Sequence, residues 1–364
     1  MFIINLLLFI LALSILIFVH ELGHFIFAKM FNVHCKEFAI GMGPAIIKKK
    51  FKWDDETTYS IRAFPIGGFV SMAGEMPGEE KSNIPPERTI NGIKAWKRAI
   101  IISAGVVFNF IFAFLLTLVV VFGGMALKDD PILNVDDSSI AYQEGLRTGD
   151  EVFSLSISGD NNNVCEGGCS ISKASQLFQY LHEAALKEEG QSQIITLEVL
   201  RDDSELTFQI NREYDVENER SQIIGISQKA ISHYPGFFEG IALSFEVYFN
   251  FMGEMFKAIG HLFTGQGLDS VGGPVEIFRV SSEVSSMGIL PYVWFVAIIS
   301  INLAFFNLLP IPGLDGSRLL TSIFEMITKK KIKPEIENMI NFIGILFLLS
   351  LIVLITIRDI SRIF

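Results

Sequence analysis

The hydrophobic and polar positions of this chain fall into separate blocks, and the longest apolar blocks predict membrane spans. A helix needs about 20 apolar residues to cross a bilayer. Four uncharged runs approach or exceed that length. We therefore expect four transmembrane helices, within residues 1–31, 99–123, 287–316 and 338–357.

Shorter periodicities elsewhere predict a different kind of helix and several strands. In residues 235–265, phenylalanines recur at helical spacing between glutamates, which predicts an amphipathic helix on the membrane surface. Two alternating stretches within residues 32–98 predict a β-hairpin. Residues 127–229 combine alternating stretches with one helical stretch, 175–186, and predict a small domain rich in strands.

Composition agrees with a membrane protein and excludes several other classes. Half of the 364 residues are hydrophobic and only 19% are charged, whereas a soluble domain carries about a quarter. The net charge of −11 argues against a nucleic-acid partner, which would require a basic face. Three cysteines are too few for a disulfide scaffold. We therefore expect an integral membrane protein.

The distribution of charge predicts how the chain is oriented. Residues 25–98 hold 12 Lys and Arg against 8 Asp and Glu, whereas residues 124–236 hold 8 against 20. Cytoplasmic loops of membrane proteins carry the excess of Lys and Arg. Residues 25–98 and the lysine-rich link 324–337 are therefore expected in the cytoplasm. The acidic segment, the amphipathic helix and both termini are expected outside.

The first span ends in His20-Glu21-Leu22-Gly23-His24, an HExxH sequence. Residues four apart lie on one face of a helix, so both imidazoles can bind one metal ion. Two neutral imidazoles suit Zn²⁺, and the glutamate can take a proton from a bound water. The alternative is a polar helix end with satisfied histidines. Ionisable groups at the end of an apolar span are costly, which favours the metal site.

A catalytic zinc site needs a third protein ligand, and the best candidate is distant in sequence. Met30 occupies the position at which the extended soluble pattern has a third histidine, and His34 and Glu37 lie just beyond the span. Asp315 follows the third span after two prolines and a glycine, so we expect it on an unwound segment. The alternative is a helix N-cap before residues 317–327. The first and third spans run in the same direction, which brings the two motifs to a similar depth.

Several motifs together resemble the site-2 proteases, intramembrane zinc metalloproteases of the bacterial RseP type. HELGH at 20–24 combines with the pattern NxxPxPxLDG at 307–316. Residues 38–44 and 64–70 are similar to the membrane-associated β-loop of that family, and Gly145-Leu146-Arg147-Thr148-Gly149-Asp150 is similar to the start of its PDZ domain. The resemblance covers essentially the whole chain.

The resemblance implies both a fold and a site. The fold is a polytopic α-helical membrane protein with four transmembrane helices, a membrane-associated β-loop and an inserted extracytoplasmic PDZ-like α+β domain. His20, His24 and Asp315 would bind zinc, and Glu21 would be the general base. Asn307 and Asn109 would contact or position substrate, although Asn109 has an alternative role in interhelical packing through an amide hydrogen bond.

The implied function is that of a membrane-embedded zinc metalloendopeptidase in a bacterial inner or plasma membrane, with its active site near the cytoplasmic side. It would perform the second cleavage of single-pass membrane proteins in regulated intramembrane proteolysis, such as that of an anti-sigma factor, or clear remnant signal peptides. Independently of the resemblance, the two strand-like stretches suggest that an exposed edge of the hairpin would hold unwound substrate as an added strand; the alternative is a hairpin with only a structural role. The PDZ-like domain would select substrates by size or by binding a new C-terminus. Its partners are these substrates and the lipid bilayer, and no nucleic acid is expected.

Two other function classes compete with this reading. A non-catalytic membrane adaptor would bind partners through the PDZ-like domain, but an intact Glu21 beside two metal-spaced histidines disfavours it. A metal transporter would need a polar path across several spans, and the sequence has one polar cluster. Of the cysteines, Cys165 and Cys169 allow a small disulfide outside the cytoplasm, and Cys35 is expected to be an inert thiol.

Overall fold

A computed structural model describes the chain apart from residues 1, 76–83, 128–129, 159–163, 187–192, 216–219, 222–223, 229–231, 264–271, 331–333 and 364. The chain divides into two compact units. The larger comprises Met1–Met125 and Pro235–Phe364, and the smaller comprises Ala126–Tyr234.

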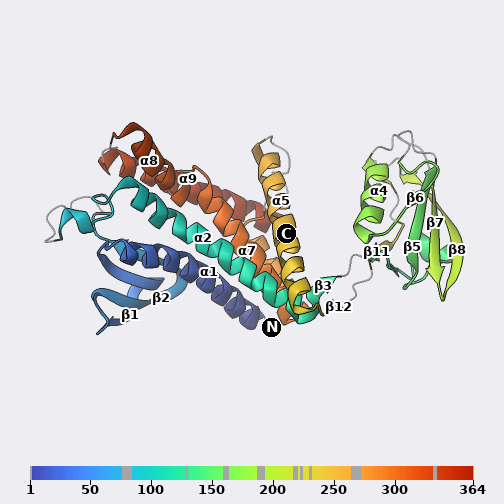
Figure 1. The fold of residues 1–364 in the computed structure, drawn as a ribbon, viewed down its shortest axis with the longest axis horizontal. Helices are drawn as coiled ribbons and strands as arrows, with labels where there is room; N and C mark the ends of the chain where they lie inside the picture. Colours follow the sequence, from blue (N-terminus) through green and yellow to red (C-terminus); the bar gives the residue numbers. More distant parts are fainter. Residues whose placement is uncertain are drawn as a thin grey trace. The chain divides into compact units, whose positions relative to one another are not determined.

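Helices dominate the larger unit (Figure 1). Its elements are α1 (Phe2–Met30), β1 (Cys35–Phe51), β2 (Asp54–Met72), α2 (Ala95–Val120), α5 (Phe237–Phe263), α6 (Pro274–Met287), α7 (Ile289–Leu308), α8 (Asp315–Thr328) and α9 (Pro334–Ile363). Short helical turns at Pro86–Arg88 and Val121–Met125 flank α2.

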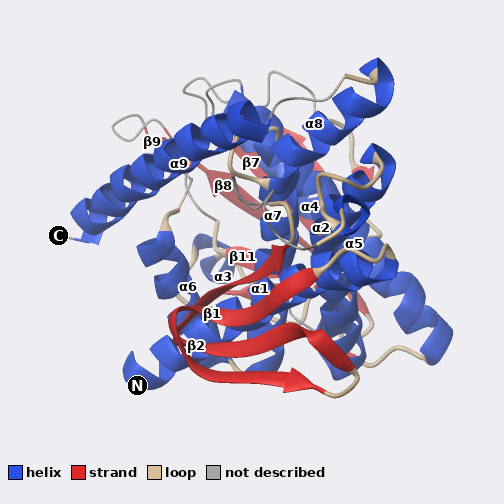
Figure 2. Cartoon of the chain, turned by 90° about the vertical axis from the view of Figure 1, so that its left-hand side faces the viewer, coloured by secondary structure: helices blue, strands red, loops and turns tan. Residues whose placement is uncertain are grey.

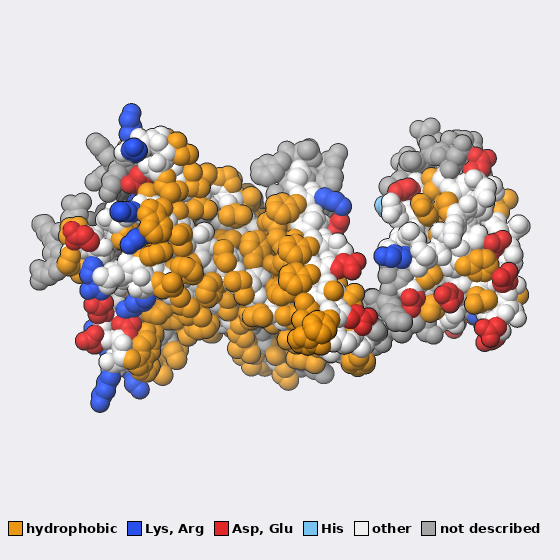
Figure 3. Space-filling model, viewed as in Figure 1, with side chains coloured by type: hydrophobic (Ala, Val, Ile, Leu, Met, Phe, Trp, Pro, Cys, Tyr) orange, Lys and Arg blue, Asp and Glu red, His pale blue; other side chains and the backbone are white. Residues whose placement is uncertain are grey.

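Four helices are long and apolar enough to cross a membrane: Phe2–Met30, Ala95–Gly124, Ile289–Leu308 and Met339–Ser361. They match the four predicted spans. Helix α2 begins four residues earlier than expected, so Lys97 and Arg98 belong to its first turns. In the face of the larger unit seen in Figure 3, apolar side chains cover the middle and charged side chains gather at the end that carries the hairpin. The pattern is that of a membrane protein.

The predicted β-hairpin is present, and it folds back on itself (Figure 2). Phe38 pairs with both Tyr59 and Val70, and Tyr59 also pairs with Lys49. The paired segments therefore lie in the order 47–49, 58–61, 37–40 and 68–71. Gly41 and Gly43 have φ values of 86° and 85°, which L-residues rarely adopt, and they allow the sharp change in register. Residues 68–71 form one edge of this small sheet.

The hairpin packs on the C-terminal end of α1, which we expect to face the cytoplasm. Phe25 and Ala28 of α1 share an apolar cluster with Phe38, Val70 and other buried side chains of the hairpin and α2. The tip is fixed as well, because Lys29 Nζ of α1 lies 2.8 Å from Asp54 Oδ1. The small sheet is thereby held against the helix that carries HExxH.

Helix α5 occupies the range expected for the amphipathic helix. Its Ser244 and Tyr248 are buried, and the Tyr248 hydroxyl donates to the Phe110 carbonyl of α2, 3.0 Å away. On the other side Phe238, Phe249 and Phe256 are exposed. The helix therefore packs on α2 with one face and presents a stripe of phenylalanines with the other, which is typical of an interfacial helix.

The smaller unit is an α+β domain. Its elements are β3 (Ala126–Leu127), β4 (Leu133–Val135), α3 (Ile140–Gln143), β5 (Glu151–Ser158), β6 (Cys169–Ser170), α4 (Ala174–Leu186), β7 (Gln193–Arg201), β8 (Ser204–Arg212), β9 (Tyr214–Asp215), β10 (Arg220–Ser221), β11 (Ile226–Gln228) and β12 (Ser232–His233). The largest sheet has the order β6-β5-β7-β8, and β11 pairs with β4.

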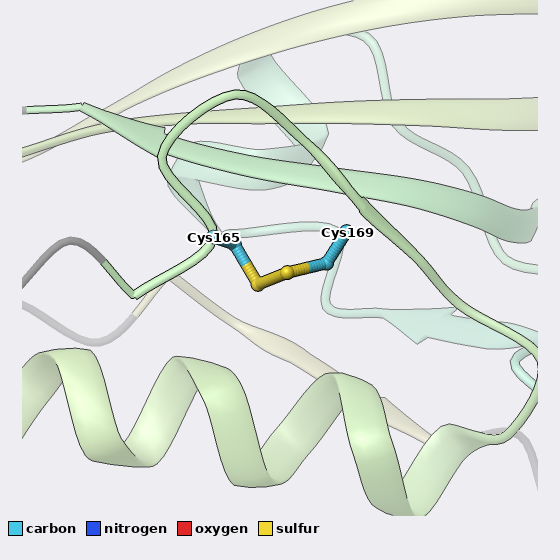
Figure 4. The surroundings of a disulfide bond; sticks show 2 residues. All are labelled: Cys165 and Cys169. Carbon is cyan, nitrogen blue, oxygen red and sulfur yellow. A yellow bond between two sulfur atoms is a disulfide. The ribbon is translucent and has the colours of Figure 1, made fainter.

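The smaller unit has its own core. Leu155, Ile195, Leu197 and Ile210 are fully or almost fully buried between the largest sheet and α4, where Leu177 lies. The strands at 194–200 and 206–210 and the helix near 175–186 thus occur where the alternation placed them. Cys165 and Cys169 form a disulfide (Figure 4). The identification of this unit as a PDZ domain stays a prediction.

The third cysteine is chemically different, and its reactivity is testable. Cys35 is fully buried at the start of β1, and burial raises the pKa of its thiol from 9.0 to about 12. Its thiolate fraction at pH 8 should therefore be about a thousandfold lower than that of an exposed cysteine, because only the thiolate reacts.

We predict that iodoacetamide at pH 8 leaves Cys35 unmodified in the folded protein and labels it after unfolding. Mass spectrometry of the digested protein measures this directly. The reaction of Cys35 should rise with pH towards 12. Rapid labelling of the folded protein at pH 8 would contradict the burial of Cys35.

Candidate metal centre

The two histidines of HExxH meet on the buried face of α1. His20 and His24 are one helical turn apart, and their Nε2 atoms lie 3.2 Å from each other. They are only 8% and 7% exposed. The spacing of four residues thus produces the convergence that the sequence predicts.

Asp315 joins this pair from the other end of the chain. Its Oδ2 atom lies 3.0 Å from His20 Nε2 and 3.2 Å from His24 Nε2. Among the described residues, these three form the group of acidic, histidine or cysteine side chains that can share one metal ion. Asp315 is not on the unwound segment that we expected. It is the first residue of α8, and the irregular backbone precedes it at residues 309–314. The prolines and Gly313, with a φ of 95°, end α7 before the ligand.

The separations fit a zinc ion. Ligands at about 2.0–2.1 Å from a tetrahedral zinc lie ~3.3 Å apart. The three donor atoms here are 3.0–3.2 Å apart. In addition, Asp315 Oδ2 is buried and accepts no hydrogen bond from any described residue. A buried carboxylate oxygen facing two imidazole nitrogens calls for a cation between them.

Hydrogen bonds on the far side of each ring set the tautomers. His24 Nδ1 lies 2.8 Å from the Ile101 carbonyl of α2. A carbonyl only accepts, so Nδ1 carries the proton and Nε2 keeps its lone pair for a metal. Such partners are common behind metal-binding histidines.

Asn109 performs the equivalent task for His20. Its side-chain amide lies 3.2 Å from His20 Nδ1, while its Oδ1 is buried and has no hydrogen-bond donor among the described residues. Exchanging the amide oxygen and nitrogen lets Oδ1 accept from His20 Nδ1–H. Asn109 is fully buried. Its side chain makes an amide contact between α2 and α1, as in the alternative role expected from the sequence, and a role in contacting or positioning substrate stays a prediction.

Close approach of α1 and α2 depends on two glycines. A Cβ atom at Gly105 would overlap Nε2 of His24 and Cε1 of His20. A Cβ atom at Gly23 would overlap the Ala104 carbonyl. Neither has room for any side chain, so the absence of Cβ is what lets α2 lie directly against the histidine pair.

Glu21 lies between the two histidines in sequence and faces the hairpin. The Val70 N–H of β2 donates to its Oε2, 3.2 Å away. A Cβ atom at Gly68 would lie 3.6 Å from Glu21 Cγ, in ordinary contact. The edge segment of the hairpin thus borders the carboxylate that the sequence assigns as general base.

The remaining candidates do not belong to the group of described residues that could share one metal ion. Asn307 is partly exposed on the last turn of α7, before the loop that leads to Asp315. His34 Nδ1 lies 3.6 Å from Glu56 Oε2, and burial lowers the pKa of His34. Glu37 accepts hydrogen bonds from Ser60 and Arg62. Among the described residues, neither His34 nor Glu37 belongs to the group of His20, His24 and Asp315 that could share one metal ion.

Sequence reasoning missed the supports around the ligands. The Ile101 carbonyl and the Val70 amide are backbone groups, which leave no signal in a sequence. The family resemblance pointed to Asn109, but the sequence does not show that it faces His20. The face of α2 that bears Ile101, Gly105 and Asn109 follows helical spacing, which is the one signal available.

We predict that Gly105→Ala weakens metal binding while the protein still folds. The new methyl group would displace His24 Nε2 or separate α1 from α2, so metal affinity should fall at least about tenfold. Metal content per chain, measured by atomic emission, tests this. Gly253→Ala is the matched control, since its Cβ would meet open space on α5. Equal metal content in both variants would contradict the packing described.

Comparison with known proteins identifies the family to which the chain belongs. The chain matches Peptidase family M50 over residues 8–351. The probable protease eep of Enterococcus faecalis is 30% identical over 439 residues, covering 98% of each chain. The zinc metalloprotease RasP of Shouchella clausii is 28% identical over 438 residues, covering 99% of each. The regulator of sigma-W protease RasP of Bacillus subtilis is 28% identical over 442 residues, covering all of each. Together with the HExxH helix and its distant aspartate, these matches show that the chain belongs to peptidase family M50, the site-2 proteases.

Proposed function

We propose that this member of the family is an intramembrane zinc endopeptidase that cleaves single-pass membrane proteins in the second step of regulated intramembrane proteolysis. The observation that carries the proposal is the convergence of His20, His24 and Asp315 from opposite ends of the chain. A buried group of this kind among helices able to span a membrane suits hydrolysis of a peptide bond within or beside the bilayer.

The proposed metal ligands are His20 Nε2, His24 Nε2 and an oxygen of Asp315. Zinc bound there would lower the pKa of a water toward ~7 and polarise the scissile carbonyl. The chain supplies the rest of the chemistry. Ile101 and Asn109 keep the imidazole protons on Nδ1, so that both rings remain neutral ligands.

Glu21 is the proposed general base. Its carboxylate would take the proton of the attacking water and deliver it to the leaving amine. The Val70 N–H holds one of its oxygens, which fixes the side chain and leaves the other oxygen for the proton. A base that is restrained in this way does not need to reorient during the reaction.

The edge of the hairpin offers a way to present an extended substrate. A transmembrane helix hides its peptide bonds within its own hydrogen bonds, so it must unwind before cleavage. Val70 directs its amide away from its partner Phe38 and toward Glu21, which marks residues 68–71 as an outer edge beside the base. Substrate added along this edge would bring its backbone close to Glu21.

We propose the remaining features from charge and family. The lysine-rich segments favour a cytoplasmic position for the hairpin and for the end of α8, with both termini outside, in a bacterial inner or plasma membrane. The name of the Bacillus subtilis relative connects it with sigma-W regulation, and an anti-sigma factor is therefore a proposed substrate here, beside remnant signal peptides. The smaller unit, as a PDZ-like domain, would select these substrates by size or by their new C-terminus. Asn307 is proposed to contact substrate.

We predict that Glu21→Gln abolishes cleavage and keeps zinc. Losing the general base should lower the cleavage rate by about 10²–10⁴-fold, whereas the three ligands are untouched. Purified protein in detergent with a single-pass substrate, followed by electrophoresis and metal analysis, measures both effects. Glu246→Gln is the control, because that carboxylate is exposed on α5. Equal cleavage by wild type and Glu21→Gln would refute the assignment of the base.

The Glu21→Gln variant can also be used to identify native substrates. Cells that express Glu21→Gln should accumulate membrane fragments that have lost their extracytoplasmic part. Affinity capture of the variant with mass spectrometry of the retained fragments identifies them. Capture of only full-length membrane proteins would contradict a role in the second cleavage.

A further inference from the structure

The proposed third ligand is carried by a helix with few fully buried side chains. Among the described residues of α8, only Gly316 and Ser322 are buried. Leu319 and Ile323 are partly buried, and Leu320, Phe324 and Ile327 are exposed. Burial of apolar side chains is the usual force that fixes a helix in place. Because this burial is limited in α8, polar contacts contribute to the position of the helix and of Asp315.

The most buried of these contacts joins α8 to α2. Arg98 is 9% exposed, and its Nη2 donates to Glu325 Oε2. Its Nε donates to Ser322 Oγ, 3.0 Å away, and Ser322 is fully buried. The two charged side chains are each 11% exposed. A buried, hydrogen-bonded ion pair of this kind has one favoured geometry, so it fixes position rather than merely adding attraction.

Arg98 also shares a face of α2 with every group that orients the histidines. Positions 98, 101, 105 and 109 follow helical spacing and lie on one side of the helix. Ile101 holds His24, Gly105 gives both rings room, and Asn109 holds His20. One face of α2 therefore contacts both histidines and, through Arg98, the helix that bears the aspartate.

Contacts in the first turn of α8 hold the start of the helix but not its far end. Gly316 packs against the Leu308 and Leu309 carbonyls, where a Cβ atom would overlap them. Arg318 Nη1 lies 2.6 Å from Glu75 Oε1. The N-cap residue, Leu314, offers no side-chain hydrogen bond. Arg98 supplies a contact near the other end, which fixes the direction of the helix.

We propose that Arg98 is a positioning residue for the third metal ligand: with Ser322 and Glu325 it holds α8 against α2, so that Asp315 remains beside His20 and His24. The charge pattern alone explained Arg98 as a marker of orientation, together with its neighbour Lys97. The structure separates the two, because Lys97 lies over the rings of Phe31 and Trp96 and does not contact α8 through any described interaction. The inference rests on the proposed zinc site.

The test is zinc retention by the purified full chain under titration with a chelator. Arg98→Ala and Glu325→Gln should each lose zinc at a chelator activity about 10–100-fold lower than wild type does, as is usual when the support of a ligand is removed. Lys97→Ala, the neighbouring control, should retain zinc like wild type. The exchanged pair Arg98→Glu with Glu325→Arg should recover part of the loss. Zinc retention by Arg98→Ala equal to that of wild type would overturn the proposal.

A double-mutant comparison separates positioning from a general loss of structure. If Arg98 acts through Asp315, Arg98→Ala should cause no further loss of zinc in an Asp315→Ala background, but it should add to the loss in a His20→Ala background. Equal additional losses in both backgrounds would mean that Arg98 supports the fold alone, and would overturn the proposal. Should Arg98→Ala fail to fold, Arg98→Lys carries the same comparison, because it keeps the charge and loses the two-pronged contact.

Failure of the inference is distinguishable from failure of the proposed function. Wild-type protein without stoichiometric zinc, or Asp315→Ala that retains zinc like wild type, would refute the proposed metal site itself. Zinc in wild type, its loss in Asp315→Ala and its full retention in Arg98→Ala would refute only the role of Arg98.

Discussion

Two imidazoles and a carboxylate lie close together in a site with little exposure to solvent. Burying such polar groups costs free energy, and the neighbouring elements of the larger unit offset that cost. An unpaired buried charge is among the most expensive features a protein can contain. His20, His24 and Asp315 offset that cost together only if a cation lies between them and if the proton of each ring is held elsewhere. The carbonyl of Ile101 and the amide of Asn109 meet the second condition. Gly23 and Gly105 make these contacts possible, since they let α2 lie close enough to the histidine rings to hold their protons.

The same constraint explains why elements far apart in sequence contribute to one site. Helix α1 provides the histidines and the proposed base, α2 provides the groups that contact the histidine rings from behind, and α8 provides the aspartate. The hairpin closes the remaining side through the Val70 N–H. It is also linked to α8, because Arg318 Nη1 lies 2.6 Å from Glu75 Oε1, just beyond the end of β2. Base and third ligand are therefore both tied to the segment that we propose to receive substrate.

Much of this was accessible from the sequence, and what was not has a physical reason. The spans, the hairpin and the helix at 237–263 follow from hydrophobic periodicity, which reports burial directly. The ligands follow from residue chemistry at the ends of apolar spans, where few charged groups occur by chance. Asp315 was expected on irregular backbone. The irregular backbone with the two prolines ends just before it, and α8 begins at Asp315. Arg98 entered only the charge count and Asn109 only the family resemblance, because their partners lie on other helices and no local pattern reveals a tertiary contact. The supports of the histidines and of Glu21 are partly backbone atoms, which carry no sequence signature.

X-ray absorption spectroscopy of the purified protein at the zinc edge tests the central claim most directly, because it reads the ligand shell itself. The account predicts about one zinc per chain with nitrogen and oxygen neighbours only, at about 2.0–2.1 Å, and imidazole scattering from two rings. Replacing Asp315 by alanine should remove an oxygen neighbour or the metal. A sulfur neighbour, a single imidazole, or a shell unchanged in the Asp315→Ala variant would contradict the site described.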